Sequence, residues 1–313
     1  KKDYNKNELN EVTHSIFYAP LYVAMNQGFF EDEGLTVTLT NGGGSDTSMS
    51  ALLTGSADII LAGPETVVYT QQEGVADKPV VFGQLTTCDG SFIVSKEDDQ
   101  NFTLADLVGE TIIGGRQGGL PAMTLQYIIE NSGYTIGTGA DEINLRTDVA
   151  FNLTASVWEG DSTVKYCTLF EPTATNIEKE GKGFVVASLG EISGSIPYTC
   201  FAAKESYLED HSDVAEKFLR AVAKGYDYII SNDSETVAKA LLPSFEGNTI
   251  AELQVAVEQY TLISAWSSDM ILTEASFNNL MNVMLNAGVI TETSNWEDIV
   301  DNTLATKVHK EVA

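Results

Sequence analysis

The chain has few of the residues that build disulfide or metal sites, and no hydrophobic run long enough to cross a membrane. Its 313 residues include three cysteines and three histidines. No stretch approaches the roughly 18 to 20 apolar residues that a transmembrane helix needs. Cys88, Cys167 and Cys200 form no CxxC pair, which excludes zinc-ribbon and thioredoxin motifs. We interpret them as small buried residues and leave their disulfide state open.

Positive charge is also scarce. The chain carries 17 Lys and Arg against 45 Asp and Glu, a formal net charge of −28. A nucleic-acid binder needs the opposite sign, so that class is excluded. The acidic residues are spread along the chain, which is typical of a solvated surface. A locally positive pocket for a small anion remains compatible with this composition.

Recognisable catalytic and metal-binding motifs are missing as well. The sequence contains no HExxH pair, no His-Cys cluster and no EF-hand loop, so we expect no metal and no cofactor. It also contains no G-x-S-x-G nucleophile elbow. The start, KKDYNKNELN, is polar and charged and lacks a signal-peptide pattern, and we interpret it as a tether or a trimmed end.

The most informative stretch that is present lies near the amino terminus, in residues 12–40. The apolar segment Val12–Phe17 predicts a strand, and a helical pattern follows it through Met25. Gly34 breaks that pattern, and apolar residues then alternate with threonines over Leu35–Thr40, as in a half-buried strand. Ligands of open α/β sheets bind beyond the carboxyl ends of the strands. We therefore expect four side chains at a ligand site: His14, Ser15, Tyr18 and Tyr22.

The same stretch resembles a family of binding proteins. Its run P-L-Y-V-A-x-x-x-G-F-F-E-D-E-G-L-x-V is similar to the start of the solute-binding proteins of ABC importers, in the group that binds alkanesulfonates, taurine and thiamine-pyrimidine precursors. The resemblance implies a type II periplasmic-binding-protein fold, with two Rossmann-like α/β lobes and the ligand between them. It also implies a monomeric, non-enzymatic, extracytoplasmic protein, in some cases a lipoprotein, that delivers its ligand to a membrane permease.

The pattern of strand, glycine-rich loop and helix starts again near Thr111, which marks a second lobe. After about residue 203 the chain reads as mainly helical, with a last helix expected over Trp296–Leu304. We predict that the chain crosses between the lobes twice, near residues 95–100 and 195–203. The first lobe would then comprise residues 1–95 and 203–313, and the second lobe residues 96–202.

The glycine-rich loop of the second lobe, GGRQGGLP, is a candidate anion site. Glycines before a helix amino terminus expose backbone N–H groups, and the helix dipole favours negative charge there. Arg116 could add a bidentate contact to a carboxylate or sulfonate. The loop lacks the Lys-Ser/Thr of a P-loop. Its candidate ligand contacts are Arg116, Gln117, Gly118 and Gly119.

Further candidates occupy predicted strand ends and helix starts. The loop N-G-G-G-S-D suits a helix N-cap, and G-P-E-T opens a helix after a buried strand. A carboxylate at such a helix start either compensates the helix dipole or accepts hydrogen bonds from a ligand amine. Tyr and Trp suit pocket walls because they need a polar partner when they are buried. These candidates are Gly44, Ser45, Glu65, Thr66, Asp89, Glu171, Tyr198 and Trp266.

Two questions stay open at the level of sequence. Arg116 and its loop favour an anionic ligand, whereas Glu65, Glu171 and the aromatic residues favour a nitrogen heterocycle. The alternative to a binding protein is an enzyme on the same fold, similar to a thiamine-pyrimidine synthase or a dehydratase of a menaquinone route. The first of these carries a cysteine-rich motif that this chain lacks. Fold alone does not decide between binding and catalysis.

Overall fold

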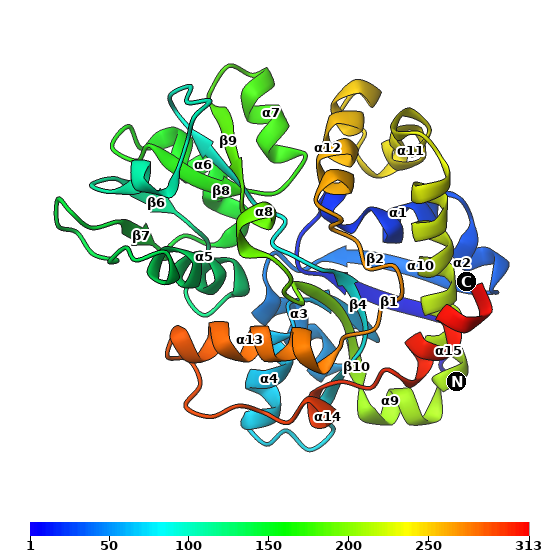
Figure 1. The fold of residues 1–313 in the computed structure, drawn as a ribbon. Coiled ribbons are helices and arrows are strands. Elements are labelled where there is room, and N and C mark those ends of the chain that lie inside the picture. The colour runs from blue at the N-terminus through cyan, green and yellow to red at the C-terminus, as the bar shows by residue number, and fades with distance from the viewer. Residues whose placement is uncertain (313) are drawn as a thin grey trace.

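The computed structural model describes residues 1–312, which form two α/β lobes, each built on a five-stranded sheet (Figure 1). The first sheet has the order β2-β1-β3-β10-β4, with β1 at Lys6–Glu11, β2 at Thr36–Asn41, β3 at Ile59–Ala62, β4 at Pro79–Thr86 and β10 at Thr199–Lys204. The second has the order β7-β6-β8-β5-β9, with β5 at Phe92–Ser95, β6 at Thr111–Ile113, β7 at Asn144–Arg146, β8 at Tyr166–Leu169 and β9 at Phe184–Ser188.

Helices cover both sheets. Those between β1 and β4 are α1 (Ala19–Asn26), α2 (Phe29–Asp32), α3 (Ser45–Thr54) and α4 (Glu65–Gln72). The middle of the chain forms α5 (Leu120–Asn131), α6 (Thr154–Gly160), α7 (Thr173–Lys179) and α8 (Leu189–Ser193). The carboxyl-terminal part forms α9 (Glu205–Asp210), α10 (Ser212–Ser231), α11 (Ser234–Leu241), α12 (Ile250–Leu262), α13 (Glu274–Asn286), α14 (Trp296–Ile299) and α15 (Thr303–Val312). Short 3-10 helices lie at Ile16–Tyr18, Leu104–Leu107, Phe151–Leu153 and Leu242–Ser244.

The first strand corrects the interpretation of the chain start as a tether. β1 is an inner strand that pairs in parallel with β2 and β3, and the expected strand at Val12–Phe17 is a loop and a 3-10 turn instead. Sequence patterns do not reveal β1, because its buried positions include the polar residues Asn7, Asn10 and Glu11. Most of their polar atoms are hydrogen-bonded inside the fold, as between Ser48 and Asn10, although the Asn7 Oδ1 has no partner in the described chain. Buried polar residues with partners leave no hydrophobic alternation to detect.

The sheet pairing also corrects both predicted lobe boundaries. β5 pairs with β8 and β9 in the second sheet, so the boundary predicted at residue 95 falls after a strand of the second lobe. β10 pairs with β3 and β4 in the first sheet, so the boundary predicted at residue 203 falls inside a strand of the first lobe. The crossings therefore lie at residues 87–91 and, after α8 of the second lobe, at residues 194–198. Both strands are apolar, and their sequences do not tell which sheet they join.

The carboxyl-terminal helices pack mainly on the first lobe. α10 lies against α1 and α15, and α15 contacts β4. Two helices also reach the second lobe, since α12 contacts α7 and α13 contacts α5 (Figure 1). The expected helix over Trp296–Leu304 is two helices, α14 and α15. Within the described residues, no helix combines the length and apolar character needed to cross a membrane.

The contact between α1 and α10 depends on Gly225. A Cβ atom at this position would lie 2.1 Å from the carbonyl oxygen of Pro20, which is backbone and cannot move aside cheaply. Helix propensity alone favours Ala over Gly by about 1 kcal/mol in a helix interior. The close approach of the two helices outweighs that preference.

We expect Gly225→Ala to lower the free energy of unfolding by about 1–3 kcal/mol, as overpacking does. Gly160→Ala is the matched control, because a Cβ atom at this helical glycine meets nothing within 4 Å. The control should be neutral or slightly stabilising. Urea unfolding of both variants measures the difference, and equal stabilities would contradict the close packing of α1 on α10.

Candidate functional site

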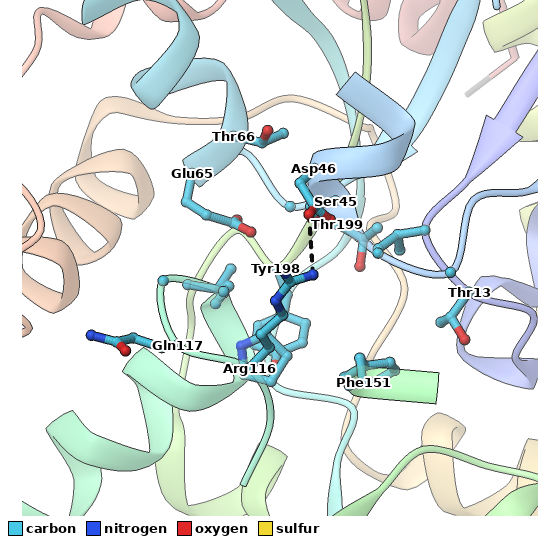
Figure 2. A pocket seen from close by; sticks show the side chains of 18 of the residues that line it. Thr13, Ser45, Asp46, Glu65, Thr66, Arg116, Gln117, Phe151, Tyr198 and Thr199 are labelled. Atoms are coloured by element: carbon cyan, nitrogen blue, oxygen red, sulfur yellow. Dashed lines mark hydrogen bonds and ion pairs between the residues drawn. The ribbon is translucent and has the colours of Figure 1, made fainter. Parts of the chain in front are cut away.

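A cavity of about 270 Å³ lies between the two lobes (Figure 2). Its walls come from the loops after β1, β2 and β3 of the first sheet and after β6, β7 and β8 of the second. Tyr198 and Thr199 complete it, at the start of β10. Since β10 is antiparallel to its neighbours, its start lies at the same sheet edge as the carboxyl ends of β3 and β4. This is where open α/β sheets place ligands.

Most of the predicted candidates line this cavity. All except Tyr198, which precedes β10, come from predicted loops that end in a helix start, and this explains why sequence patterns could find them. Whether they contact a ligand stays a prediction. The predicted residues on the cavity wall are Tyr18, Gly44, Ser45, Glu65, Thr66, Arg116, Gln117, Gly118, Gly119 and Tyr198.

His14 and Tyr22 do not line the cavity, and this corrects their predicted place. Both bind the buried carboxylate of Glu11 instead: His14 Nδ1 lies 2.6 Å from one oxygen, and the Tyr22 hydroxyl donates to the other at 2.6 Å. Burial lowers the pKa of His14, but hydrogen bonds with Glu11 and the Ser244 carbonyl outweigh it, so the pKa is raised. These side chains keep a buried charge paired at the end of β1.

Four other candidates also lie outside the cavity wall and make internal contacts. Ser15 caps the first 3-10 turn by accepting a hydrogen bond from the Phe17 N–H. The indole N–H of Trp266 donates to the Phe17 carbonyl at 2.8 Å, so Trp266 fills core. Glu171 accepts a hydrogen bond from the Thr175 N–H at 3.0 Å, and Asp89 accepts one from the Ser91 N–H at 2.8 Å. A strand-end position alone did not decide whether these side chains point into the cleft.

The sequence interpretation missed several lining residues. Most are neighbours of predicted ones in the same loops. The sequence contained a usable signal for Tyr69 as a lining residue, because Tyr69 follows Glu65 by one helical turn and so lies on the same face of α4. Phe151 and Phe170 had none, since aromatic residues usually fill core. The missed residues are Val12, Thr13, Gly43, Asp46, Gly63, Tyr69, Leu120, Pro121, Phe151, Phe170 and Thr199.

Glu65 is the most unusual group in the cavity. Its side chain is 2% exposed, and its Oε2 atom has no hydrogen-bond partner in the described chain. Burial raises the pKa of Glu65 to about 7, although the N–H groups of Glu65 and Leu120 and the Ser45 hydroxyl lower it. The carboxyl group lies over Gly63, where a Cβ atom would collide with it at 2.0 Å. A buried carboxyl with a free oxygen can accept hydrogen bonds from a ligand.

Arg116 and Asp46 form an ion pair across the cavity, drawn as a dashed line in Figure 2. The Arg116 Nη1 lies 3.1 Å from the Asp46 Oδ2, and the two side chains are 61% and 64% exposed. An exposed pair of this kind contributes at most about 1 kcal/mol. In this pair the carboxylate of the first lobe balances the guanidinium of the second at the cavity wall.

Tyr69 joins the lobes in a second way. Its hydroxyl, on α4 of the first lobe, donates to the carbonyl oxygen of Gly118 at 2.8 Å. Gly118 has a φ of 82°, a conformation that glycine adopts without strain. Glu65 and Tyr69 therefore present a carboxyl and a phenol from one helix face to the turn that begins α5.

The lining residues include no Lys, His or Cys in the described part of the chain. The three cysteines, Cys88, Cys167 and Cys200, are free thiols buried elsewhere. Among residues 1–312, no group of three or more His, Cys, Asp or Glu side chains could hold a metal ion. The chemistry of the cavity is therefore that of hydroxyls, aromatic rings, backbone groups, one ion pair and one buried carboxyl.

Solved structures define the fold class. The ligand-binding component of an ABC-type import system from Staphylococcus aureus aligns with a TM-score of 0.75, at 13% identity over 97% of this chain and 98% of that one. The alkanesulfonate-binding protein SsuA from Xanthomonas axonopodis pv. citri, bound to MOPS, also gives 0.75, at 14% identity over 97% and 100%. The desulfurization enzyme DSZB gives 0.65, at 12% identity over 98% and 100%. The chain has the type II periplasmic-binding-protein fold, on which both binders and an enzyme occur.

Sequence comparison then gives the family. The chain belongs to the NMT1/THI5-like family, whose model matches residues 16–236. It is 37% identical over 306 residues, 98% of this chain and 90% of the other, to YtlA of Bacillus subtilis, which is named as a candidate binding protein. It is 24% identical over 248 residues, 78% of this chain and 72% of the other, to a formylaminopyrimidine-binding protein of Halalkalibacterium halodurans.

The buried carboxyl predicts a pH dependence of stability. The folded chain keeps a proton on Glu65 up to a pKa of about 7, whereas the carboxyl has an ordinary value of 4.5. Because the folded state binds the extra proton, Glu65 costs stability increasingly as the pH rises from about 4.5 to about 7. We expect Glu65→Gln to be up to about 3 kcal/mol more stable than wild type near pH 8, and equally stable near pH 4.

Urea unfolding at the two pH values measures this difference. Glu73→Gln is the control, since Glu73 is an exposed carboxylate at the far end of the same helix. It should change stability by less than about 0.5 kcal/mol at either pH. A Glu65→Gln effect that is the same at both pH values would show that the carboxyl is not held neutral by burial.

The bond between the lobes gives a further prediction. Tyr69→Phe removes the hydroxyl that holds Gly118, so we expect the free energy of unfolding to fall by about 0.5–1.5 kcal/mol. We also expect the ligand-free protein to open, because fewer contacts then join the lobes. Small-angle X-ray scattering should show a larger radius of gyration. Tyr134→Phe, at a half-buried tyrosine of the second lobe, is the control; an unchanged radius for Tyr69→Phe would exclude a role in closure.

Proposed function

We propose that the chain is the extracytoplasmic solute-binding component of an ABC importer, and that it binds a small, flat nitrogen heterocycle between its lobes. The observation that carries this proposal is the Glu65 carboxyl, buried on the cavity wall with an unpartnered oxygen. A buried acceptor without a partner costs about 1–3 kcal/mol. A ligand that donates an N–H group to Glu65 recovers that cost on binding.

The charges of the cavity favour such a ligand over a sulfonate. Arg116 is the only Lys or Arg among the described lining residues, and Asp46 already pairs with it. A sulfonate would have to displace Asp46 and lie in the same cavity as Glu65, which resists a nearby negative charge. A ring that carries an amine would instead find hydrogen-bond acceptors in the cavity, such as the carboxyl groups of Glu65 and Asp46. The backbone N–H groups at the start of α5 are the remaining support for an anion.

The size and the aromatic content of the cavity fit a single ring system. A volume of about 270 Å³ lies just below the range of about 300–1,000 Å³ that is usual for small-molecule sites. The wall contains three tyrosines and two phenylalanines, whose faces pack against flat apolar groups. These aromatic residues are Tyr18, Tyr69, Tyr198, Phe151 and Phe170.

Relatives support the transport role. YtlA, which is 37% identical over 306 residues, is named as a candidate binding protein, and the alignment with the formylaminopyrimidine-binding protein covers 78% of the chain. A neighbour in fold belongs to an ABC-type import system. We propose by analogy that this chain acts outside the cytoplasm as a monomer, and that its partner is a membrane permease. A lipid anchor is part of the same proposal.

Catalysis is the competing interpretation, because the desulfurization enzyme DSZB shares the fold. A carboxyl with a pKa of about 7 also suits a general base. The cavity offers no lysine for a Schiff base among its described residues. Incubation of the protein with a bound heterocycle, followed by mass spectrometry of the recovered ligand, separates the two: recovery of unaltered ligand supports binding, and conversion supports an enzyme.

Isothermal titration with formylaminopyrimidine and with MOPS tests the ligand class. We expect the pyrimidine to bind and MOPS to bind at least tenfold more weakly. At pH 8, where the Glu65 carboxyl is mainly charged, Glu65→Gln should weaken pyrimidine binding by about 1.5–3 kcal/mol, as loss of a hydrogen bond to a charged group does. Arg116→Ala should change it by less than about 1 kcal/mol, because its ion pair is exposed.

A second pattern of results would reverse the assignment. If MOPS binds more tightly and Arg116→Ala abolishes its binding, the ligand is an anion and the proposed role of Glu65 is wrong. Asp46→Asn sharpens this test, because removal of the balancing carboxylate should strengthen binding of an anion and leave a neutral pyrimidine unaffected. Arg146→Ala controls for the general loss of a positive charge, since Arg146 pairs with Asp148 and Asp161 away from the cavity wall.

A further inference from the structure

A second cavity lies between the lobes, apart from the one described above. It has a volume of about 220 Å³ and is enclosed by α5 of the second lobe, α13 of the first and the segment that follows α8. α13 runs alongside α5 in Figure 1, and contacts join both α13 and α8 to α5. Its lining residues include none from the first cavity.

A buried hydroxyl in this cavity lacks a partner. Thr124, in the middle of α5, is 2% exposed and lines the cavity, and its Oγ1 atom makes no hydrogen bond in the described chain. The great majority of buried polar side-chain atoms do have a partner, and an unpartnered one costs about 1–3 kcal/mol. The hydroxyl is therefore available to a molecule in the cavity.

The other walls combine an apolar base with uncharged polar groups. Ile128, Ile196 and Val283 are buried and form the apolar part. Two amides on α13 add hydrogen-bonding groups: Asn279 donates to the Ser195 carbonyl at 2.9 Å through its Nδ2, which leaves its Oδ1 as an acceptor, and Asn282 is exposed at the rim. An amide both donates and accepts, which suits a hydroxyl group.

No Asp, Glu, Lys or Arg lies among the lining residues of this cavity in the described chain. A charged ligand would therefore lose its hydration without gaining a counter-charge, which is expensive. Tyr127 supplies an aromatic ring, which can cover the C–H face of a small sugar while the amides and hydroxyls bind its polar edge.

We propose that the cavity between α5 and α13 is a second binding site, which takes a small uncharged polyhydroxyl compound of the size of a tetritol or a pentose. The Thr124 hydroxyl, the two asparagine amides and the tyrosine ring supply the contacts. The site touches both lobes, so its occupant binds only when α5 and α13 are in the observed arrangement.

One helix connects this site to the first cavity. Leu120 and Pro121, in the first turn of α5, line the first cavity, and Thr124 lies one turn further along the same helix. An occupant that fixes α5 against α13 also fixes the first turn of α5. Any effect of one site on the affinity of the other must be reciprocal.

Saturation-transfer NMR with erythritol and with D-ribose tests the site in the ligand-free protein. We expect at least one of the two compounds to bind in the millimolar range. Thr124→Val keeps the shape of the side chain but removes the hydroxyl, and it should weaken binding at least threefold. Asn282→Trp places a large ring at the exposed rim and should abolish binding.

Asn278→Trp is the matched control, because Asn278 is an exposed asparagine one turn earlier on α13 and does not line the cavity. It should leave binding unchanged. Absence of binding for both compounds, or binding that survives Asn282→Trp, would overturn the proposal. If Thr124→Val does not fold, Asn282→Trp still tests the site, because Asn282 is an exposed residue.

The test does not depend on the proposed function. It uses no ligand of the first cavity, and Glu65→Gln should leave erythritol and ribose binding unchanged. Loss of sugar binding in Glu65→Gln but not in Asn282→Trp would show that the compounds occupy the first cavity, and would overturn the second site. Failure of the pyrimidine titration alone would refute the proposed ligand class and leave this site standing.

Discussion

The arrangement of the ligand cavity depends on one contact, between one face of α4 and the turn that begins α5. Tyr69 holds the carbonyl of Gly118, and Glu65, one helical turn earlier, lies beside the Leu120 N–H. The exposed pair of Arg116 and Asp46 also joins the two lobes at the cavity, as does the contact between the rings of Phe170 and Tyr198. Glu65 and Tyr69, on one face of α4, thus contact the second lobe and also form part of the cavity wall.

Burial at this contact also raises the pKa of a carboxyl in the cleft of this strongly acidic protein. Removing Glu65 from water favours its protonated form, and burial outweighs the nearby N–H groups that favour the charged form. Glu171 and Asp89 follow the same rule, since burial raises the pKa of Glu171 to about 7 and that of Asp89 to about 6. Of these three, only Glu65 lines the cavity, so only its cost can be recovered by a ligand there.

How far the sequence predicts this structure varies from element to element. The pattern around Gly114–Pro121 predicted a strand, a turn and a helix, and β6 and α5 confirm it. Sequence patterns did not reveal β1, because its buried side chains are mostly polar.

For the site, a strand-end position placed Glu65 and Tyr198 correctly on the cavity wall, but it placed His14 and Trp266 there as well. His14 binds Glu11 across a short loop, and Trp266 binds the Phe17 carbonyl, which is 249 residues away in the sequence. A strand-end position does not predict either contact.

The sequence by itself determined the two α/β lobes, the helical carboxyl-terminal part and the glycine-rich turn, because hydrophobic period and glycine position are local properties of the chain. Only the tertiary structure decided which lobe β5 and β10 join, and that Asp46 balances Arg116. The charge balance of the cavity, on which the proposed preference for a nitrogen heterocycle over an anion rests, follows from that pairing. Asp46 and Arg116 are 70 residues apart, and local patterns carry no information about a contact between two chain segments that meet only after both lobes have folded.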